Sequence, residues 1–310
     1  MAKVFKLRKG LNIPLKGKPE NIWLNSSVSI PQKIGICPDD FIGLIPKPMV
    51  EENNIVKIGS PLFYHKNFPE IIVTSPISGN LVSIKRGLKR KIETFIIESD
   101  YKNLYDENNK IDISKLSGDE IRTALLKTGL WVYIRQRPFN YIANPNIKPK
   151  AIFISAFDTA PLAPDIEIIL QDKLEPLQEG INILKKLANV PIYVGLKKDK
   201  SSIFEKIENI NVNYFDGPHP AGNVGIQIHH IDPINKGEVV WTLQPEDLII
   251  LGKYSLTAQY DASRIITLVG SQVLKPGYVN TIQGAEISSF TKNNVIGENN
   301  RFISGNVLTG

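Results

Sequence analysis

Apolar and polar residues alternate in short runs over the first third of the chain, and this pattern predicts β-strands. Residues 55–63 and 74–82 both alternate, each turns on a glycine, and the second run carries Ser75-Pro76 before its turn. A further strand is predicted at residues 93–98. A period of two places successive side chains on opposite faces of a sheet, so each strand has one buried face.

The two glycine-turned runs resemble the two halves of the biotinyl/lipoyl barrel-sandwich fold. Members of that fold carry a cofactor on a lysine in the hairpin between the halves. The corresponding hairpin here is residues 64–68, which read Tyr-His-Lys-Asn-Phe with Lys66 at the centre. It lacks the Met-Lys-Met of biotin carriers and the Asp-Lys-Ala of lipoyl carriers. We therefore expect the barrel-sandwich scaffold without the carrier chemistry.

Helical and strand patterns alternate through the middle of the chain. A helix is predicted at residues 112–128, with Ser117 as its cap and Glu120 three residues later. A continuous apolar strand at 151–156 precedes a long helix at 165–187, bent or broken at Pro176. A strand at 191–195, a short helix at 201–207 and a strand at 212–215 follow. This alternation predicts a doubly wound, Rossmann-like α/β domain.

The pattern becomes all-β after residue 253. Strands are predicted at 264–270 and 274–279 around a Pro-Gly turn, with a helical turn starting at 284–287. This order resembles the soluble-ligand-binding β-grasp module. The expected domains are an N-terminal wrapping segment at 1–36, a barrel-sandwich domain at 37–102, a Rossmann-like domain at 103–253 and a β-grasp module at 254–310.

The charge distribution limits the partners. The 310 residues carry a formal net charge of +6, concentrated in basic groups at 3–9, 85–91 and 197–200. Such groups are either solvated loop ends or sites for an acidic partner or an anionic membrane surface. They lack interleaved aromatic residues, so we expect no nucleic-acid binding. No apolar run reaches the roughly 18 residues of a membrane span, and no apolar segment follows the basic start, so we expect a mature cytoplasmic chain.

The metal-binding residues are few. The single cysteine, Cys37, excludes an intrachain disulfide and a four-cysteine cluster, and we expect it to be a buried, inert thiol. His229 and His230 are adjacent, so on a strand they would point to opposite faces and share no metal. We expect no metal site.

Two loops at strand ends carry candidate binding residues. Asp158 and Thr159 follow the first predicted strand of the α/β domain, where such domains bind ligands. Asp158 could equally cap the next helix, which is the favoured interpretation. The Pro- and Gly-rich loop at 216–225 follows the third strand and places His219 at the same sheet edge. His219 could hydrogen-bond a partner loop or a quinone oxygen, or serve only the loop structure.

An aromatic and basic cluster follows the first predicted helix. It consists of Trp131, Tyr133, Arg135, Arg137 and Phe139. These side chains could stack on a planar ligand, but Trp, Tyr and Arg also concentrate at protein interfaces, and we favour the interface. No catalytic triad, Walker loop or Gly-x-Gly-x-x-Gly motif is present, so we expect no catalytic residues in the chain itself.

Six strings in order over nearly the whole chain resemble the A subunit of the bacterial sodium-translocating NADH:quinone reductase. They are KGLNIP at 9–14, TSPISG at 74–79, TGLW with RQRPF at 128–139, AIFI with DTAPLA at 151–163, GPHPAG at 217–222 and RFISG at 301–305. The resemblance implies a peripheral protein on the cytoplasmic side of the bacterial inner membrane. Its partners would be the other subunits of the complex, especially the membrane-embedded quinone and flavin subunit.

The resemblance also bears on cofactors. Flavin-bearing relatives of the family have a glycine-rich loop where this chain has bulky residues at 129–133, so we expect no bound flavin and no covalent cofactor. Ubiquinone or menaquinone is the implied ligand, with Trp131, Tyr133, Arg135 and His219 as candidate contacts.

The alternatives are a flavin- and iron–sulfur-bearing Rnf-type protein, a biotin or lipoyl carrier acting through Lys66, and a pure assembly scaffold. Family members continue for roughly a hundred further residues, so we expect their C-terminal helical domain to be absent here.

Overall fold

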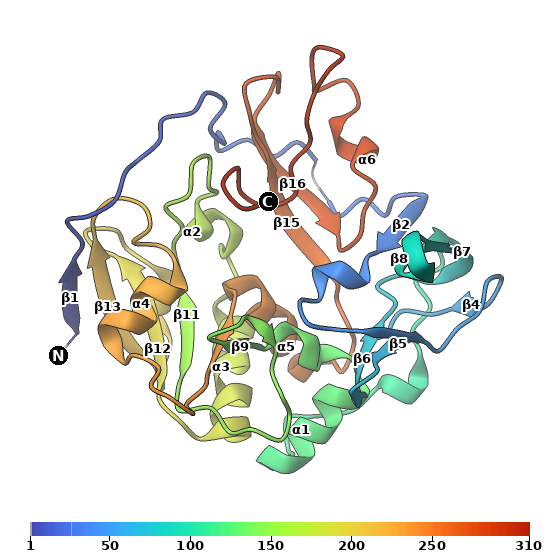
Figure 1. Cartoon of the computed structure of the whole chain (residues 1–310), viewed down its shortest axis with the longest axis horizontal. Coiled ribbons are helices and arrows are strands. Elements are labelled where there is room, and N and C mark those ends of the chain that lie inside the picture. The colour runs from blue at the N-terminus through green and yellow to red at the C-terminus, as the bar shows by residue number, and fades with distance from the viewer. Residues whose placement is uncertain (1, 26) are drawn as a thin grey trace.

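The computed structural model describes residues 2–25 and 27–310 as a mixed α/β chain with four β-sheets. Figure 1 shows a seven-stranded sheet on the left, a four-stranded and a three-stranded sheet on the right, and a two-stranded sheet above them. One continuous apolar core extends from Ile34 in the four-stranded sheet to Ile282 in the two-stranded sheet. The sheets are therefore packed into a single body.

The seven-stranded sheet is mixed: its first five strands pair in parallel, and its last two are joined to it by antiparallel pairings. Its strands, in order across the sheet, are β1 (Lys3–Lys6), β13 (Asn211–Asp216), β12 (Ile192–Lys197), β11 (Ile152–Ser155), β14 (Val240–Leu243), β9 (Arg135–Arg137) and β10 (Tyr141–Ile142). The central strand β11 begins with three buried apolar residues, as expected for a strand in a sheet that helices cover on both faces. The edge strand β1 comes from the N-terminal segment and pairs with β13, about 200 residues later in the sequence.

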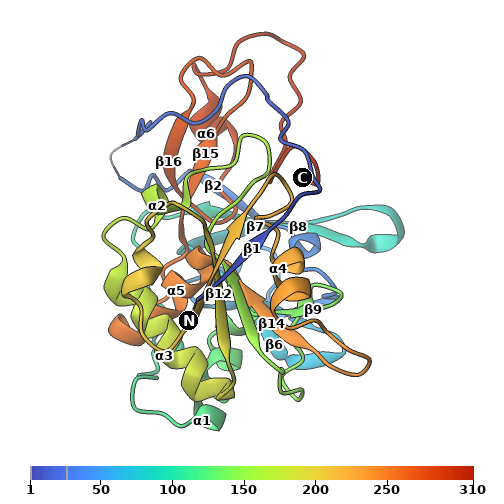
Figure 2. The same ribbon diagram turned by 90° about the vertical axis from the view of Figure 1, so that its left-hand side faces the viewer.

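Helices lie on the two faces of this sheet. Figure 2 shows α3 (Leu174–Ala188) and α5 (Pro245–Thr257) on one side and α4 (Val224–Ile231) on the other. The helices α3 and α5 approach closely because glycines stand at their crossing. A Cβ on Gly252 would overlap the carbonyl oxygen of Pro176, and one on Gly180 would lie 2.5 Å from that of Leu248.

Two predictions for this region were wrong in part. The helix predicted at 165–187, bent or broken at Pro176, is two helices, α2 (Ile166–Ile169) and α3, and the break lies at residues 170–173, just before Pro176. Pro176 lies in the first turn of α3, where a proline removes no intrahelical hydrogen bond. His229 and His230 lie in α4 and not on a strand. The strands β11, β12 and β13 and the short helix η5 (Ile203–Lys206), capped by Ser202, match the predicted order.

The first predicted helix is α1 (Gly118–Lys127), six residues shorter at its start than the pattern indicates. Ser117 and Glu120 form the capping box that was predicted, with Glu120 Oε2 accepting from the Ser117 backbone N–H at 2.9 Å. The 3₁₀ turn η4 (Leu130–Tyr133) follows α1 directly, and its four side chains are buried.

The four- and three-stranded sheets pack face to face. The strands of the first are β2 (Lys33–Ile36), β8 (Ile92–Ser99), β7 (Gly79–Arg86) and β4 (Ile55–Val56), and those of the second are β3 (Pro46–Pro48), β5 (Pro61–His65) and β6 (Phe68–Thr74). The stacked rings of Phe63 and Phe95, 4.8 Å apart, join the two sheets. Short 3₁₀ turns complete this part: η1 (Pro38–Asp40), η2 (Leu88–Arg90) and η3 (Glu107–Asn109). Lys66 is exposed in the turn between β5 and β6.

The two-stranded sheet pairs β15 (Ser263–Leu268) with β16 (Gly277–Ile282), and the short helix α6 (Ser288–Thr291) follows. The N-terminal segment runs from β1 over the top of the molecule to this sheet, as the blue trace in Figure 1 shows. There Leu24 donates its backbone N–H to the Tyr278 carbonyl at 2.8 Å, and the Trp23 ring lies 5.6 Å from the Tyr278 ring. The segment thus ties the seven-stranded sheet to the two-stranded sheet.

Candidate functional site

Trp131 is a core residue. Its side chain is fully buried, its Nε1 donates to the Ala143 carbonyl at 2.7 Å, and its ring packs edge to face with Trp241 at 5.5 Å. The neighbouring residues of η4 are buried as well, so bulky side chains fill the space beside Gly129. Trp131 therefore cannot reach a ligand at the surface.

Tyr133 lies at the junction of the sheets, in a network of buried polar groups. Its hydroxyl lies 2.7 Å from the Tyr260 hydroxyl and donates to Gln283 Oε1 at 2.9 Å. The Arg264 guanidinium lies over the Tyr133 ring, 5.2 Å from its centroid. Burial raises the pKa of both tyrosines, so both hydroxyls stay protonated near neutral pH. The network binds the end of η4 to the segments that lead into β15 and out of β16.

A largely buried ion pair, with side chains that are 19% and 15% exposed, supports this junction. Arg264 Nη2 contacts Asp247 Oδ1 at 2.8 Å, and Glu246 Oε1 accepts from the Ile265 backbone N–H at 3.3 Å. Burial raises the pKa of the Glu246 carboxyl, although the nearby Arg264 opposes the shift. Sequence reasoning missed these residues. The available signal was a charged residue, Arg264, at the start of an apolar strand.

Arg135 and Arg137 point from the same face of β9. Arg135 Nη2 donates to the Asp40 carbonyl at 3.2 Å, which links the seven-stranded sheet to η1. Arg135 Nη1 and Arg137 Nε are buried and have no hydrogen-bond partner within residues 2–25 and 27–310. Burial lowers the pKa of both guanidinium groups. The two arginines therefore hold desolvated donors close to the surface.

Phe139 departs from the rest of the predicted cluster because it is exposed. Its side chain is 71% exposed and stacks on Tyr141, which is 51% exposed, with ring centroids 5.8 Å apart. Tyr141 also packs against the backbone at Gly43, next to the exposed Ile42. The predicted cluster is thus divided between the core, the junction and an exposed aromatic patch.

Asp158, Thr159 and His219 lie at the carboxyl edge of the seven-stranded sheet. Thr159 Oγ1 is 3.1 Å from His219 Nδ1 and accepts from the Gly222 backbone N–H at 3.0 Å. Asp158 Oδ1 accepts from the Ala160 N–H at 2.7 Å, so it closes a turn, and Asp165 is the residue that caps α2.

The His219 loop is also bonded to the N-terminal segment. The His219 backbone N–H donates to Asn12 Oδ1 at 3.1 Å, and the His219 carbonyl accepts from the Leu11 N–H at 3.0 Å. The polar groups of this loop therefore serve contacts within the chain.

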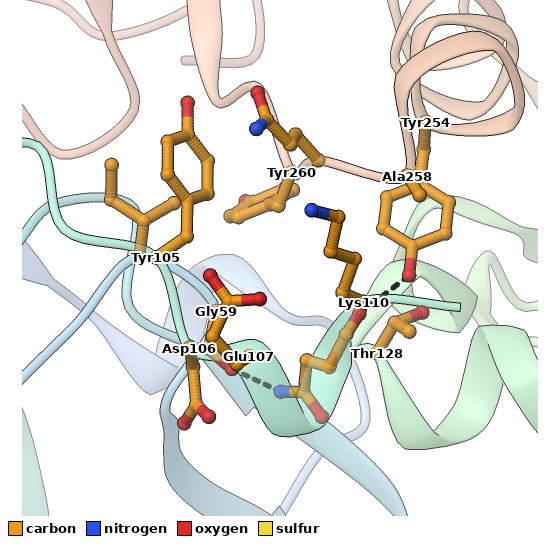
Figure 3. A pocket seen from close by; sticks show the side chains of 12 residues that line it. Gly59, Tyr105, Asp106, Glu107, Lys110, Thr128, Tyr254, Ala258 and Tyr260 are labelled. Carbon is orange, nitrogen blue, oxygen red and sulfur yellow. Dashed lines mark hydrogen bonds between the residues drawn. The ribbon is translucent and has the colours of Figure 1, made fainter. Parts of the chain in front are cut away.

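Figure 3 shows a small pocket beside Tyr260, which is partly open to the solvent and has about 20 Å³ of room for the centres of water-sized groups. Ile58 and Tyr105 line it from the barrel-sandwich side, and Tyr254 and Tyr260 line it from α5 and the segment beyond. The Tyr254 hydroxyl donates to the Asn109 carbonyl at 2.6 Å, which fixes one wall. Lys110, the neighbour of Asn109 in the chain, extends from that wall into the pocket between Tyr254 and Tyr260. The pocket therefore combines three aromatic side chains with one long, flexible cation, and Asp106 and Glu107 also line it.

Cys37 is half-buried, with its Sγ 3.4 Å from Thr94 Oγ1, so the thiol is less buried than expected. Within residues 2–25 and 27–310, no group of three or more His, Cys, Asp or Glu side chains is placed to hold a metal ion. In the same residues, no helix combines the length and the apolar character that crossing a membrane requires.

Three family models match successive parts of the chain. They are the NqrA N-terminal barrel-sandwich hybrid domain at residues 5–100, the NqrA second alpha/beta domain at 116–260 and the NQRA C-terminal domain at 265–310. The first match confirms the predicted barrel-sandwich scaffold.

Curated relatives match over nearly the full chain. The A subunit of the Na(+)-translocating NADH-quinone reductase of Neisseria meningitidis serogroup A is 35% identical over 309 residues, which are 99% of this chain and 69% of that protein. The corresponding protein of Pasteurella multocida is 34% identical over 306 residues, 98% of this chain and 68% of that protein. A solved NAD+-reducing [NiFe]-hydrogenase is 13% identical over 47% of this chain and 33% of that one, with a TM-score of 0.36. The identity and coverage of the curated relatives, together with the three domain matches, establish that the chain belongs to the family of the A subunit of the Na(+)-translocating NADH-quinone reductase.

Proposed function

We propose that the chain is a peripheral subunit that carries no redox cofactor and docks on its partner subunits through the patch formed by Phe139, Tyr141 and Ile42. The partners would be the membrane-embedded subunits of the reductase, on the cytoplasmic side. The stacked, exposed pair of Phe139 and Tyr141 carries this proposal. Exposed aromatic side chains beside arginine are typical of the centre of an interface, where they lose their water contacts.

The buried donors beside the patch support the same function. Arg137 Nε lacks a partner in the described residues, and Arg137 lies on β9, next to the hairpin that holds Phe139. A partner carboxylate or carbonyl would supply the missing acceptor, since a buried donor without a partner is costly. The filled space beside Gly129 supports the absence of a flavin, because Leu130 and Trp131 occupy it.

The docking test compares variants in the assembled complex. Phe139→Ser with Tyr141→Ser should greatly reduce the amount of the chain that copurifies with the other subunits. The matched control is Ile55→Ser with Leu274→Ser, which changes two leucine-sized side chains that are 82% and 57% exposed elsewhere. If both double variants copurified with the other subunits in the same amount as the wild type, the patch would be ruled out as the docking site.

Quinone binding is a second candidate, favoured by the pocket in Figure 3. Its tyrosines offer flat apolar faces to a planar ring, and the Lys110 ammonium could donate to a quinone oxygen once the flexible side chain swings aside to admit the ring. Trp131 and Tyr133 are not contacts in this proposal, because the indole is in the core and the Tyr133 hydroxyl is already bonded.

Saturation-transfer NMR with a soluble ubiquinone analogue tests the pocket. Tyr105→Ala and Lys110→Ala should weaken saturable binding, whereas Tyr101→Ala and Lys102→Ala, which are nearby but outside the pocket, should not. An absence of saturable binding to the wild-type chain would contradict this proposal and would leave the docking function untouched.

We also propose the finer fold assignment. The order β13-β12-β11-β14 corresponds to the strand order 3-2-1-4 of a doubly wound, Rossmann-like sheet. The hairpin of β15 and β16, followed by α6, supports a β-grasp module. The corresponding domain boundaries are 1–36, 37–102, 103–253 and 254–310.

A further inference from the structure

The hairpin of β7 and β8 extends beyond the body of the molecule. Its strands pair as far as Arg86 and Ile92, and the turn between them contains the short 3₁₀ segment η2. Figure 2 shows this hairpin projecting to the right, away from the other sheets. Among the described residues, the ion pair between Lys91 and Asp39 ties the tip to the rest of the chain.

Leu88 occupies the tip. It is 91% exposed, which is the highest value among the exposed large apolar side chains of the described residues. The next two residues, Lys89 and Arg90, have φ angles of +54° and +61°. Left-handed conformations cost free energy for residues with a side chain, so this turn is held in an unusual shape that keeps Leu88 outward.

Cations surround the exposed leucine. The turn and strand ends contain five of them and no acidic residue between positions 85 and 91, namely Lys85, Arg86, Lys89, Arg90 and Lys91. Only Lys91 forms an ion pair in the described residues, with Asp39 at 2.5 Å. Two carboxylates lie along the hairpin: Glu52 accepts from the Ile84 N–H at 2.8 Å, and the Glu93 carboxylate lies beside Gly87, the residue before Leu88. Four cations therefore remain available to a partner.

This combination fits one kind of anionic partner best. An apolar side chain ringed by lysine and arginine can enter the boundary between acyl chains and headgroups while the cations contact lipid phosphates. A nucleic acid offers no apolar region for Leu88, and the tip has no aromatic ring to stack on bases.

We propose that the tip of the β7–β8 hairpin, with Leu88 and the flanking Lys85, Arg86, Lys89 and Arg90, binds the surface of an anionic phospholipid bilayer. This inference rests on the proposed peripheral placement and deepens it, but it does not use the docking patch around Phe139. The hairpin would give the chain a second contact with the membrane face, in addition to its partner subunits.

Vesicle flotation with the isolated chain tests the proposal. The chain should float with vesicles that contain phosphatidylglycerol and stay in solution with vesicles of phosphatidylcholine alone. Lys89→Gln with Arg90→Gln should weaken binding by about twenty-five-fold, since each cation near an anionic surface contributes roughly fivefold. The matched control, Lys206→Gln with Lys236→Gln, removes the same charge from two exposed positions far along the sequence and should bind like the wild type.

Leu88→Ser separates insertion from simple attraction of charges. It keeps every cation but should weaken binding by about tenfold, because it removes the buried apolar group. The control Leu274→Ser changes a leucine that is 57% exposed in another part of the chain and should have no effect. Raising the salt concentration should weaken the wild type, because screening reduces the charge contribution.

Several results would overturn the proposal. Equal flotation with neutral and anionic vesicles would overturn it. Vesicle binding that Lys89→Gln/Arg90→Gln and Leu88→Ser both retain would also overturn it. The affinity for an oligonucleotide is measured as well. If that affinity fell in Lys89→Gln/Arg90→Gln as much as vesicle binding did, and did not fall in Leu88→Ser, the tip would be a general polyanion site. If the chain did not bind vesicles and the hairpin variants no longer copurified with the assembled complex, the partner of the tip would be an acidic protein. The vesicle result does not depend on the docking test, because the two tests use different residues and different material.

Discussion

The hydroxyl groups of Tyr133 and Tyr260 lie 2.7 Å apart, although 127 positions separate them in the sequence. Tyr133 ends the 3₁₀ turn that follows α1, and Tyr260 precedes β15. Tyr260 also lines the pocket in Figure 3. This one hydrogen bond therefore connects the seven-stranded sheet, the two-stranded sheet and the pocket.

Tyr133→Phe should destabilise the chain by about 1–3 kcal/mol, because it leaves the buried partners Tyr260 and Gln283 with one hydrogen bond fewer. Urea unfolding measures the free-energy difference. Tyr101→Phe serves as the control, since that side chain is 59% exposed, and it should change stability very little. Equal stability of Tyr133→Phe and the wild type would mean that the network does not hold the junction together.

The ion pair of Arg264 and Asp247 should behave as a buried pair. Arg264→Met alone should cost about 3 kcal/mol, because it leaves the Asp247 carboxylate without its partner. Arg264→Met combined with Asp247→Asn should cost less than the sum of the two single changes. The surface pair of Lys91 and Asp39 provides the comparison, and Lys91→Met should cost less than about 1 kcal/mol. Additive costs in the buried pair would contradict this coupling.

The pH dependence of stability should reveal Glu246. Burial raises the pKa of this carboxyl above its ordinary value of 4.5, so the folded chain holds the proton more tightly than the unfolded chain does. Stability from this group therefore falls as the pH rises from 4.5 through the folded pKa. Glu246→Gln keeps an oxygen for the Ile265 N–H and removes the titration, so its stability relative to the wild type should rise across that interval and then stay constant.

Glu120 provides a comparison of opposite sign. Hydrogen bonds from the Ser117 N–H and hydroxyl lower the pKa of the Glu120 carboxyl below 4.5. Its contribution is therefore present above pH 4.5 and lost as the pH falls through the folded pKa. Denaturant titrations at a series of pH values would show Glu120→Gln losing stability relative to the wild type above pH 4.5. The same direction of change for both variants would be inconsistent with the assigned environments.

The crossing of α3 and α5 should tolerate no side chain at Gly252. Gly252→Ala would drive a Cβ into the Pro176 carbonyl oxygen, so we expect a loss of more than about 2 kcal/mol. Gly225→Ala is the matched control within α4, where no atom lies within 4 Å of the new Cβ. It should stabilise the chain by about 0.5–1 kcal/mol, because alanine favours a helix over glycine. Thermal unfolding of both variants measures the difference in sign.

Much of the local structure followed from the sequence. The apolar run at β11, the Ser117 capping box and the strand at 93–98, observed as β8, were all predicted at or near their observed positions, whereas the strand β6 was not predicted. These features depend on hydrogen bonds and side-chain periodicity over a few residues, which the sequence displays directly. The family resemblance was confirmed for the same reason, since its strings are local and in order.

The candidate site depended far more on the tertiary structure. Five residues that looked like one cluster are divided, with Trp131 in the core, Tyr133 at the junction and Phe139 at the surface. Their burial depends on which distant strands pack over them, and no local pattern records that. The break in the helix at 165–187 was predicted at Pro176 but lies a few residues earlier, because a proline in a first turn looks like a proline in the middle of a helix when the helix start is unknown.

The sequence by itself therefore determined many of the elements, their order and the family of this chain, although α4, β14 and α5 were not predicted. Only the tertiary structure decided that β1 pairs with β13, that Arg264 finds Asp247 and that Leu88 is left in the solvent. The physical reason is that elements form from interactions between near neighbours, whereas pairing and burial require segments far apart in the chain to meet. That meeting depends on the packing of the whole core, which the order of residues alone does not reveal.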